Sequence, residues 1–241
     1  MKRFALSILG GLIFLAGILL ELSLSGAVLW GEVEARTYTP QIGDAGLGLN
    51  CPFILSSAES GTVSTSITNT MDEETSPVIT AEISRSDGQQ QLSQTLTLAA
   101  HATQALRWTV DPSEIIFGRL ILVNIVQSRF KDLPSRQGAC GILVFNLFGL
   151  NGIQSFILLT VTSLAGLLLG AVIWFRANWP LNELRRSTAQ ASAVNAGMAT
   201  AGLLAALPRW WGLILFFDFL TLLIMAVVLT EFVLFPRRLR H

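Results

Sequence analysis

Long apolar runs and one stretch of alternating polarity divide this chain. Residues 1–30, 151–176 and 210–235 are strongly apolar, and each run reaches the length of about 20 residues that a helix needs to cross a bilayer. Residues 188–207 form a weaker run that is rich in Ala, Gly, Ser and Thr. We therefore expect a multi-pass membrane protein with four helices and one large segment, residues 31–150, inserted between the first two.

Positive charges predict how these helices are oriented, because Lys and Arg beside a span favour the cytoplasmic side. Lys2 and Arg3 precede the first run, Arg176 and two further arginines follow the second, and three arginines lie in the tail PRRLRH. Placing all three groups inside the cell requires four crossings. The predicted order is helix 1–30, exterior domain 31–150, helix 151–176, cytoplasmic loop 177–187, helix 188–207, and a fourth helix with its cytoplasmic basic tail in 208–241. The chain is then expected in the cell membrane with both termini cytoplasmic.

The first apolar run has two interpretations. A cleaved secretory signal also begins with positive charge, and it would be cut after Ala35 in EVEA. The apolar region is longer than the about 7 to 15 residues of such a signal, which favours an uncleaved signal-anchor. Either interpretation sends residues 36 onward out of the cytoplasm.

The small-residue run predicts a helix that is enclosed by protein rather than by lipid. Lipid tails are as apolar as leucine, so helices in a bilayer associate through close packing and hydrogen bonds, which small residues permit. We expect Gly197, Ala201 and Gly202 to lie in helix contacts. Gly166 and Gly170 form a small-xxx-small pair in the second run and are expected to pack similarly.

Polar residues inside the apolar runs are candidate functional residues. Asp218 lies about 10 Å from the outer end of the fourth run, and Glu21 interrupts the first run. A charged carboxylate at the centre of a span costs about 2.5 to 3.5 kcal/mol on insertion scales, so such residues usually face a bundle interior or a water path. Asp218 is either part of an ion or proton site, or a structural carboxyl bonded to Thr200 or a partner subunit. Asn195 and Thr200 are expected to find hydrogen-bond partners.

The sequence between the first two apolar runs is typical of a β-sheet domain. Short stretches rich in Val, Ile, Thr and Leu alternate apolar and polar positions and are separated by turn sequences such as NTMDEETSP and SRSDGQ. The spacing predicts an antiparallel β-sandwich of immunoglobulin-like architecture, with Trp108 in its core. The six predicted strands lie at residues 61–70, 77–85, 91–98, 104–110, 119–129 and 138–146.

The two cysteines, Cys51 and Cys140, both lie in this exterior segment. Disulfides persist in an extracytoplasmic compartment, so a pair of cysteines there predicts a disulfide. The alternative is a thiol enzyme that combines Cys140 with His101 and Arg129, as in sortases. The sequence around Cys140 lacks the threonine and leucine strand that leads into a sortase cysteine, which favours the disulfide.

Composition narrows the function further. The chain is 51% hydrophobic and only 13% charged, and its exterior segment carries more acidic than basic residues. Nucleic-acid binding would need a basic face, so we expect no nucleic-acid partner. MDEET, residues 71–75, lacks the glycine and the spacing of a calcium loop, and no nucleotide or zinc motif occurs. We expect no metal, no cofactor and no catalytic residue.

The arrangement of four helices with an exterior β-sheet between the first two resembles claudins in topology. The claudin signature, a tryptophan followed by GLW and two nearby cysteines, is absent, and AVLWGE matches it poorly. The resemblance implies the topology alone, and no function or residue is carried over from it.

The sequence therefore predicts a non-catalytic membrane protein that acts as an interaction module or as an accessory subunit of a membrane assembly. Its expected partners are the lipid bilayer and a protein partner, or a second copy bound through the small-residue helix or the exterior domain. The alternative is a small transporter or channel component that uses Asp218 and Glu21.

Overall fold

The computed structural model describes residues 2–38, 45–85, 88–181 and 183–234. These residues contain four long helices, nine strands and one 3₁₀ helix. Contacts divide the chain into two units, Met1–Leu29 with Ile157–His241, and Trp30–Phe156. The first unit is helical, and the second is a β-sheet domain into which the last turns of the first helix continue.

Three of the described helices are long and apolar enough to cross a membrane, namely α1, α2 and α4. The remaining helix, α3, has 24 residues, but three charged residues in its first turn, together with Ser, Thr, Asn and Gln, keep its hydropathy low. The basic tail, residues 236–241, lies outside the described residues. The bounds are α1 Lys2–Tyr38, α2 Gly152–Asn178, α3 Glu183–Ala206 and α4 Trp211–Leu234.

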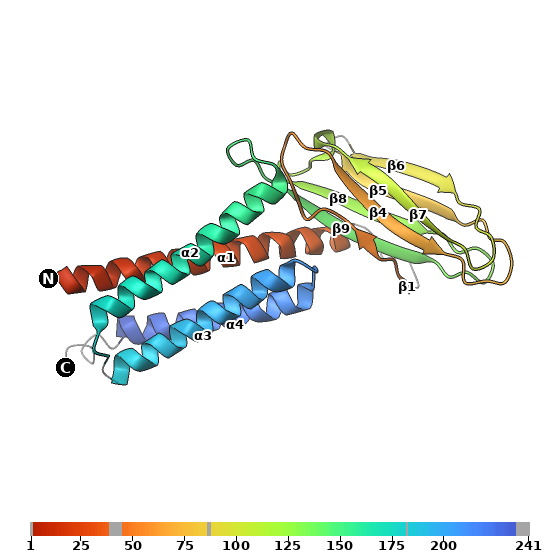
Figure 1. The fold of residues 1–241 in the computed structure, drawn as a ribbon. Helices are drawn as coiled ribbons and strands as arrows, with labels where there is room; N and C mark the ends of the chain where they lie inside the picture. Colours follow the sequence, from red (N-terminus) through yellow and green to blue (C-terminus); the bar gives the residue numbers. More distant parts are fainter. Residues whose placement is uncertain (1, 39–44, 86–87, 182, 235–241) are drawn as a thin grey trace. The chain divides into compact units, whose positions relative to one another are not determined.

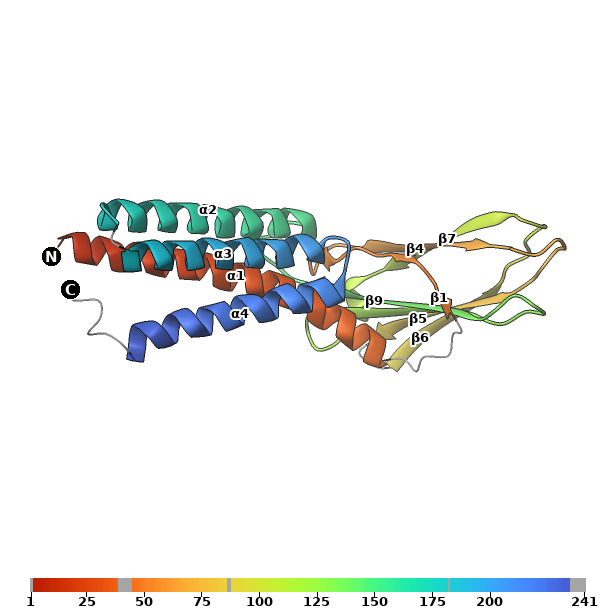
Figure 2. The same ribbon diagram turned by 90° about the horizontal axis from the view of Figure 1, so that it is seen from below.

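The helices of the first unit run side by side in alternating directions (Figures 1 and 2). The start of α1, the end of α2, the start of α3 and the end of α4 all lie at one end of the unit. The turn between α3 and α4 lies at the opposite end. This up-and-down order follows from short connections, since residues 179–182 and 207–210 leave no room for a crossover.

Glycines bring α1 and α2 into close contact. A Cβ added to Gly17 would lie 2.9 Å from the Ser163 carbonyl oxygen, and one added to Gly170 would overlap the backbone nitrogen of Phe14. Gly166 faces Gly17, with 3.5 Å between its added Cβ and the Gly17 Cα. The predicted pair Gly166 and Gly170 therefore lies in this helix contact, where small residues let the backbones approach.

The β-sheet domain consists of two sheets that enclose one apolar core (Figure 2). The larger sheet has the order β1-β9-β8-β5-β6, with β3 also paired to β9, and the smaller one has the order β2-β4-β7. The six predicted strands are β4 to β9, and Trp108 lies in the core. The bounds are β1 Ala45–Gly46, β2 Leu49–Asn50, β3 Ile54–Leu55, β4 Gly61–Thr68, β5 Val78–Arg85, β6 Gly88–Thr95, β7 Thr103–Val110, β8 Leu120–Gln127 and β9 Arg136–Val144, with the 3₁₀ helix at Pro112–Glu114.

A disulfide joins Cys51 to Cys140, as predicted, across a sequence separation of 89 residues. Cys51 directly follows the two-residue strand β2, and Cys140 lies in β9. The bond therefore connects the end of β2 in the smaller sheet with β9 in the larger one. Closing a loop of this length stabilises the domain by roughly 4 to 5 kcal/mol in the chain-entropy model.

The last turns of α1, residues 30–38, belong to the domain and pack on the outer face of the larger sheet. Ala35 is 2% exposed and packs against Leu120 and Leu122 of β8. A Cβ added to Gly141 of β9 would overlap the carbonyl group of Gly31. Two glycines thus permit a helix and a strand to touch through their backbones. The sequence interpretation ended this helix at residue 30, because its apolar run ends there while the amphipathic continuation is short.

We expect Gly141→Ala to lower the free energy of unfolding of the domain by about 1 to 3 kcal/mol, the usual cost of forcing an extra methyl group into a packed contact. Hydrogen-exchange mass spectrometry of the full-length protein in detergent would show this as faster exchange in β8 and β9. Gly46→Ala is the matched control, because a Cβ at Gly46 of β1 meets no atom within 4 Å. Equal exchange in the two variants would contradict the proposed backbone contact.

Candidate functional site

Glu21 lies in the middle of α1 and is fully buried within the helical unit. Thr200 of α3 donates its hydroxyl to the carboxyl group, with Oγ1 3.3 Å from Oε1 and 3.2 Å from Oε2. Ser163 of α2 also donates, with Oγ 3.4 Å from Oε1. Two other helices therefore supply the hydrogen bonds of this one carboxyl group.

Asp218 of α4 joins the same region through Ser25, which lies one turn after Glu21 on α1. The Ser25 Oγ is 3.0 Å from each carboxyl oxygen of Asp218, and it is also 3.0 Å from the backbone carbonyl oxygen of Glu21. A Cβ added to Gly202 of α3 would lie 2.7 Å from Asp218 Oδ1, so a glycine makes room for this carboxyl group. We call Glu21, Ser25, Ser163, Thr200 and Asp218 the carboxyl cluster.

The carboxyl cluster combines two acids with three hydroxyls and contains no base. Residues 4–35, 152–175, 187–208 and 210–236 contain no Lys or Arg, so no side chain of these segments can neutralise either acid. Each hydroxyl has one proton to donate, whereas an ionised carboxyl group offers about four acceptor sites. The hydroxyls therefore leave acceptor capacity on both carboxyl groups. The cluster has the chemistry to hold a proton or a small cation between helices.

The structure brings together most of the polar residues that the sequence singled out, but it pairs them differently. Thr200 bonds Glu21, and the hydroxyl partner of Asp218 is Ser25 rather than Thr200. Ser25 and Ser163 were not singled out from the sequence. The available signal for Ser25 is its position four residues after Glu21, on the same helix face. Ser163 gives no such signal, because its partner lies on another helix.

The small residues predicted on the third helix fall into two groups. Gly202 is buried against Asp218, as described above, and Ala201 is half-buried. Gly197 is exposed, and a Cβ there would meet no atom within 4 Å, so it makes no close contact in the described part of the chain. Its side of α3 faces away from the other helices. Asn195 is 5% exposed, and its amide oxygen has no hydrogen-bond partner among the described residues.

The β-sheet domain contains few residues that are candidates for catalysis or metal binding. The disulfide uses the Cys140 thiol, so the thiol-enzyme alternative lacks its nucleophile. His101 is exposed, and its Nε2 lies 2.9 Å from Asp72 Oδ1, on the surface. Burial raises the pKa of Glu114, whose Oε2 accepts a hydrogen bond from the Asp111 backbone at 2.9 Å. Within the described residues, no three His, Cys, Asp or Glu side chains are placed to hold a metal ion.

No family model and no curated protein matches this chain. Among solved structures, a β-glucuronidase of Bacteroides uniformis is matched with 22% identity and a TM-score of 0.31, over 40% of this chain and 12% of the enzyme. The CARDB domain of a Pyrococcus furiosus protein is matched with 10% identity and a TM-score of 0.32, over 44% of this chain and 92% of that domain. Red sea bream transglutaminase is matched with 10% identity and a TM-score of 0.35, over 44% of this chain and 17% of the enzyme. Likenesses of this size give no information about function.

Proposed function

We propose that this chain is a non-catalytic membrane protein whose immunoglobulin-like extracytoplasmic domain joins two copies of the chain as part of a membrane assembly. The observation that carries this proposal is strand β6, which has no charged residue and whose outer side pairs with no strand in the described part of the chain. The four-helix unit serves as the membrane anchor, and the disulfide-closed domain serves as the interaction module.

The proposed topology has four crossings of the cell membrane, with both termini cytoplasmic and residues 31–150 extracytoplasmic. The 24 residues of α3 extend about 36 Å, against a hydrocarbon core of about 30 Å. Thr200 bonds Glu21, and Asn195 is buried, so these polar groups of α3 face protein. A helix of this kind needs little hydropathy to cross, because its polar groups avoid lipid. The disulfide supports an extracytoplasmic location for the domain.

Packing within the domain favours an uncleaved signal-anchor. Gly31 and Ala35 of α1 cover the outer face of the larger sheet, including Leu120 and Leu122. Cleavage after Ala35 would remove both residues and expose these two leucines, which are at most 1% exposed. Exposed apolar surface of this kind destabilises a domain, so retention of α1 accounts better for the packing.

The strand order supports an immunoglobulin-like architecture. Seven main strands are β2, β4, β5, β6, β7, β8 and β9, and the first, second and fifth of them form the smaller sheet. In immunoglobulin-like sandwiches the A, B and E strands likewise share one sheet, while C, F and G share the other. Here the fourth strand pairs with the third, as strand C′ does. The disulfide differs from that of antibody domains, because it joins the segment after the first strand to the last strand.

Strand β6 presents an open backbone edge. It pairs with β5 over all eight of its residues, and no described strand pairs with its other side. Native sheets usually protect such edges with charged residues, proline or a bulge. The sequence GQQQLSQT contains neither a charge nor a proline, and Leu92 within it is 40% exposed. An edge without these protections can accept a further strand.

A second copy of the same chain is the proposed occupant of this edge. Two β6 strands can pair antiparallel about a two-fold axis, which is the commonest symmetry of protein dimers. Because β6 is uncharged, the two paired strands carry no like charges opposite each other, and Gln, Ser and Thr can hydrogen-bond across the pair. The paired strands would continue the larger sheet from one copy into the other.

We expect the variant Gln91→Cys to form a covalent dimer when the full-length protein, in mild detergent, is treated with a short bismaleimide. Both native cysteines are in the disulfide, so the new thiol is the single reactive one. Adding Leu92→Lys should reduce cross-linking at least about tenfold, because it places like charges opposite each other at the pair. SDS gel electrophoresis measures the dimer fraction.

Gln104→Cys is the matched control. Gln104 is also an exposed glutamine on an outer strand, but it lies on β7, which carries Arg107. The proposal requires that this variant stays monomeric. A monomeric Gln91→Cys protein, or equal cross-linking at both positions, would overturn the pairing of two copies through β6.

A second candidate function follows from the carboxyl cluster. Glu21 and Asp218 come from different helices and lack a basic partner, and the Ser25 hydroxyl bonds both the Asp218 carboxyl group and the backbone carbonyl oxygen of Glu21. The two acids therefore lie in one region of the helical unit, each bonded by hydroxyl groups that can relay protons. This arrangement supports a proton-conducting component, which was the alternative drawn from the sequence.

For that candidate, proteoliposomes loaded with a pH-sensitive dye should take up protons faster than empty liposomes when a membrane potential is imposed. Asp218→Asn removes the titratable proton but keeps the shape of the side chain, and it should return the uptake to the rate of empty liposomes. Ser23→Ala is the control, because the Ser23 hydroxyl is exposed and bonds the carbonyl oxygen of Leu19 within its own helix. Equal rates with and without wild-type protein would exclude this candidate.

A further inference from the structure

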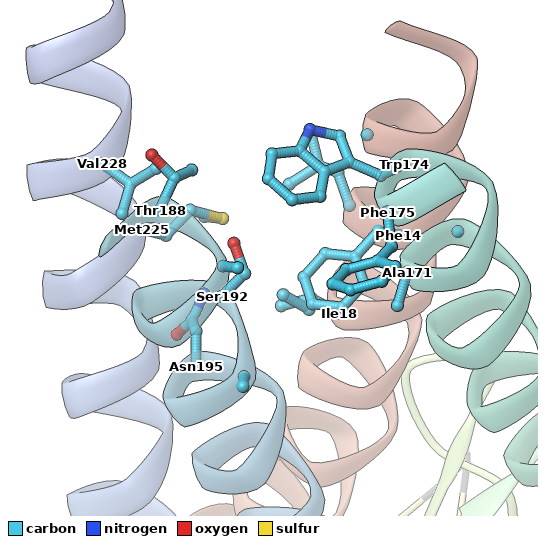
Figure 3. A pocket seen from close by; sticks show the side chains of 15 residues that line it. Phe14, Ile18, Ala171, Trp174, Phe175, Thr188, Ser192, Asn195, Met225 and Val228 are labelled. Carbon is cyan, nitrogen blue, oxygen red and sulfur yellow. The ribbon is translucent and has the colours of Figure 1, made fainter. Parts of the chain in front are cut away.

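A cavity of about 380 Å³ lies within the helical unit, and no residue of the carboxyl cluster lines it. Side chains of all four helices line it. Figure 3 shows Phe14, Trp174 and Phe175 on one side of the space and Ser192 and Asn195 on the other. Its volume is near the lower end of the range of about 300 to 1,000 Å³ that is typical of small-molecule sites.

The lining of the cavity is apolar except on α3. Three polar residues, Thr188, Ser192 and Asn195, are the polar members of the lining, and all belong to α3. Their spacing of four and three residues places them on one face of that helix. The cavity therefore has an apolar wall from α1 and α2 and a polar stripe from α3. Such a wall with a few polar groups is the usual composition of a ligand site.

Asn195 is the polar group of this lining that the fold leaves unsatisfied. The side chain is 5% exposed, and its amide oxygen is buried without a hydrogen-bond partner among the described residues. A buried amide without a partner costs free energy, whereas a bound hydroxyl could satisfy it. A hydroxyl both donates and accepts, so it suits either end of the amide group.

The cavity reaches the surface of the helical unit between α2 and α3. Ala171 and Phe175 of α2 and Ala193 of α3 line it and are also exposed. If these helices cross the bilayer as proposed above, this opening faces acyl chains rather than water. A ligand that enters here must be soluble in lipid.

We propose that this cavity binds a lipid-soluble molecule with a single hydrocarbon chain and a hydroxyl group, such as a long-chain alcohol. The hydroxyl hydrogen-bonds to the Asn195 amide, and the chain packs against Phe14, Ile18 and Trp174. This inference rests on the proposed membrane crossing of α3 but is independent of pairing through β6. A protein that fails to dimerise would leave it intact.

The test uses the full-length protein in lipid nanodiscs and a hexadecanol that carries a photoreactive diazirine in its chain. Peptide mass spectrometry should locate labelling in α2 and α3 residues that line the cavity. Loss of one hydrogen bond is expected to reduce labelling about tenfold in Asn195→Leu, which keeps the branched shape and the number of heavy atoms of the side chain. The methyl ether of the same probe should label the wild-type protein about as weakly.

Ala193→Phe provides a second variant, because it fills the opening without altering Asn195, and it should abolish labelling. Val194→Phe is its matched control: Val194 is the next residue on α3, is 52% exposed and does not line the cavity. Labelling that is equal for the alcohol and the ether would overturn the proposed hydroxyl recognition. Labelling that falls equally in Ala193→Phe and Val194→Phe would overturn the assignment of the site to this cavity.

Lipid extraction of the purified protein distinguishes the sources of such a ligand. An acylglycerol or an isoprenoid alcohol that is retained by the wild type and lost from Asn195→Leu would support the proposal and name the source. Retention of phospholipid alone, to the same extent in both proteins, would contradict it.

Discussion

Two carboxyl groups placed in apolar helical segments that carry no basic residue constrain this protein more than any other feature. Glu21 and Asp218 need hydrogen-bond donors, and in a bilayer such donors must come from other helices. Ser163 and Thr200 donate hydrogen bonds to the Glu21 carboxyl group, while Ser25 donates to that of Asp218. The helical unit can therefore satisfy both acids only when all four helices are packed together.

The composition of α3 follows from this constraint. A third helix rich in large apolar residues would be more hydrophobic, but it could not bring Thr200 to Glu21 or give Asp218 the space that Gly202 leaves. The small residues lower its hydropathy below that of a typical span and at the same time allow the close packing on which the acids depend. The cavity beside Asn195 is lined by three polar residues of the same helix, Thr188, Ser192 and Asn195.

In the β-sheet domain, a disulfide and backbone contacts fix the residues at which the domain begins and ends. The disulfide connects the beginning of the domain to its last strand, and the contact between Gly31 and Gly141 sets α1 directly on that strand. Near the start of α2, the Glu59 carboxylate accepts a hydrogen bond from the Gly152 backbone at 2.8 Å. Residues at the beginning and at the end of the domain are thus part of its packing.

Local patterns in the sequence predicted where the longer helices and strands lie, but they did not predict which residues of distant segments contact each other. The alternation of apolar and polar residues located β4 to β9, and hydropathy located α1, α2 and α4, because both patterns depend on neighbours along the chain. The two-residue strands β1, β2 and β3 are too short to show a period. The pairing of Ser163 with Glu21, and of Gly31 with Gly141, depends on contacts between distant segments, which a single sequence does not encode locally. The two acids were recognisable as unusual, but their convergence was not.

The membrane crossing of α3 is the most direct test of this account, because the carboxyl cluster requires it. Ser187→Cys and Leu207→Cys place single reactive thiols near the two ends of α3, since both native cysteines are in the disulfide. A membrane-impermeant maleimide applied to right-side-out vesicles should label the protein at residue 207 and leave it unlabelled at residue 187 until the membrane is permeabilised. Labelling of both positions from the same side of the membrane would contradict the account.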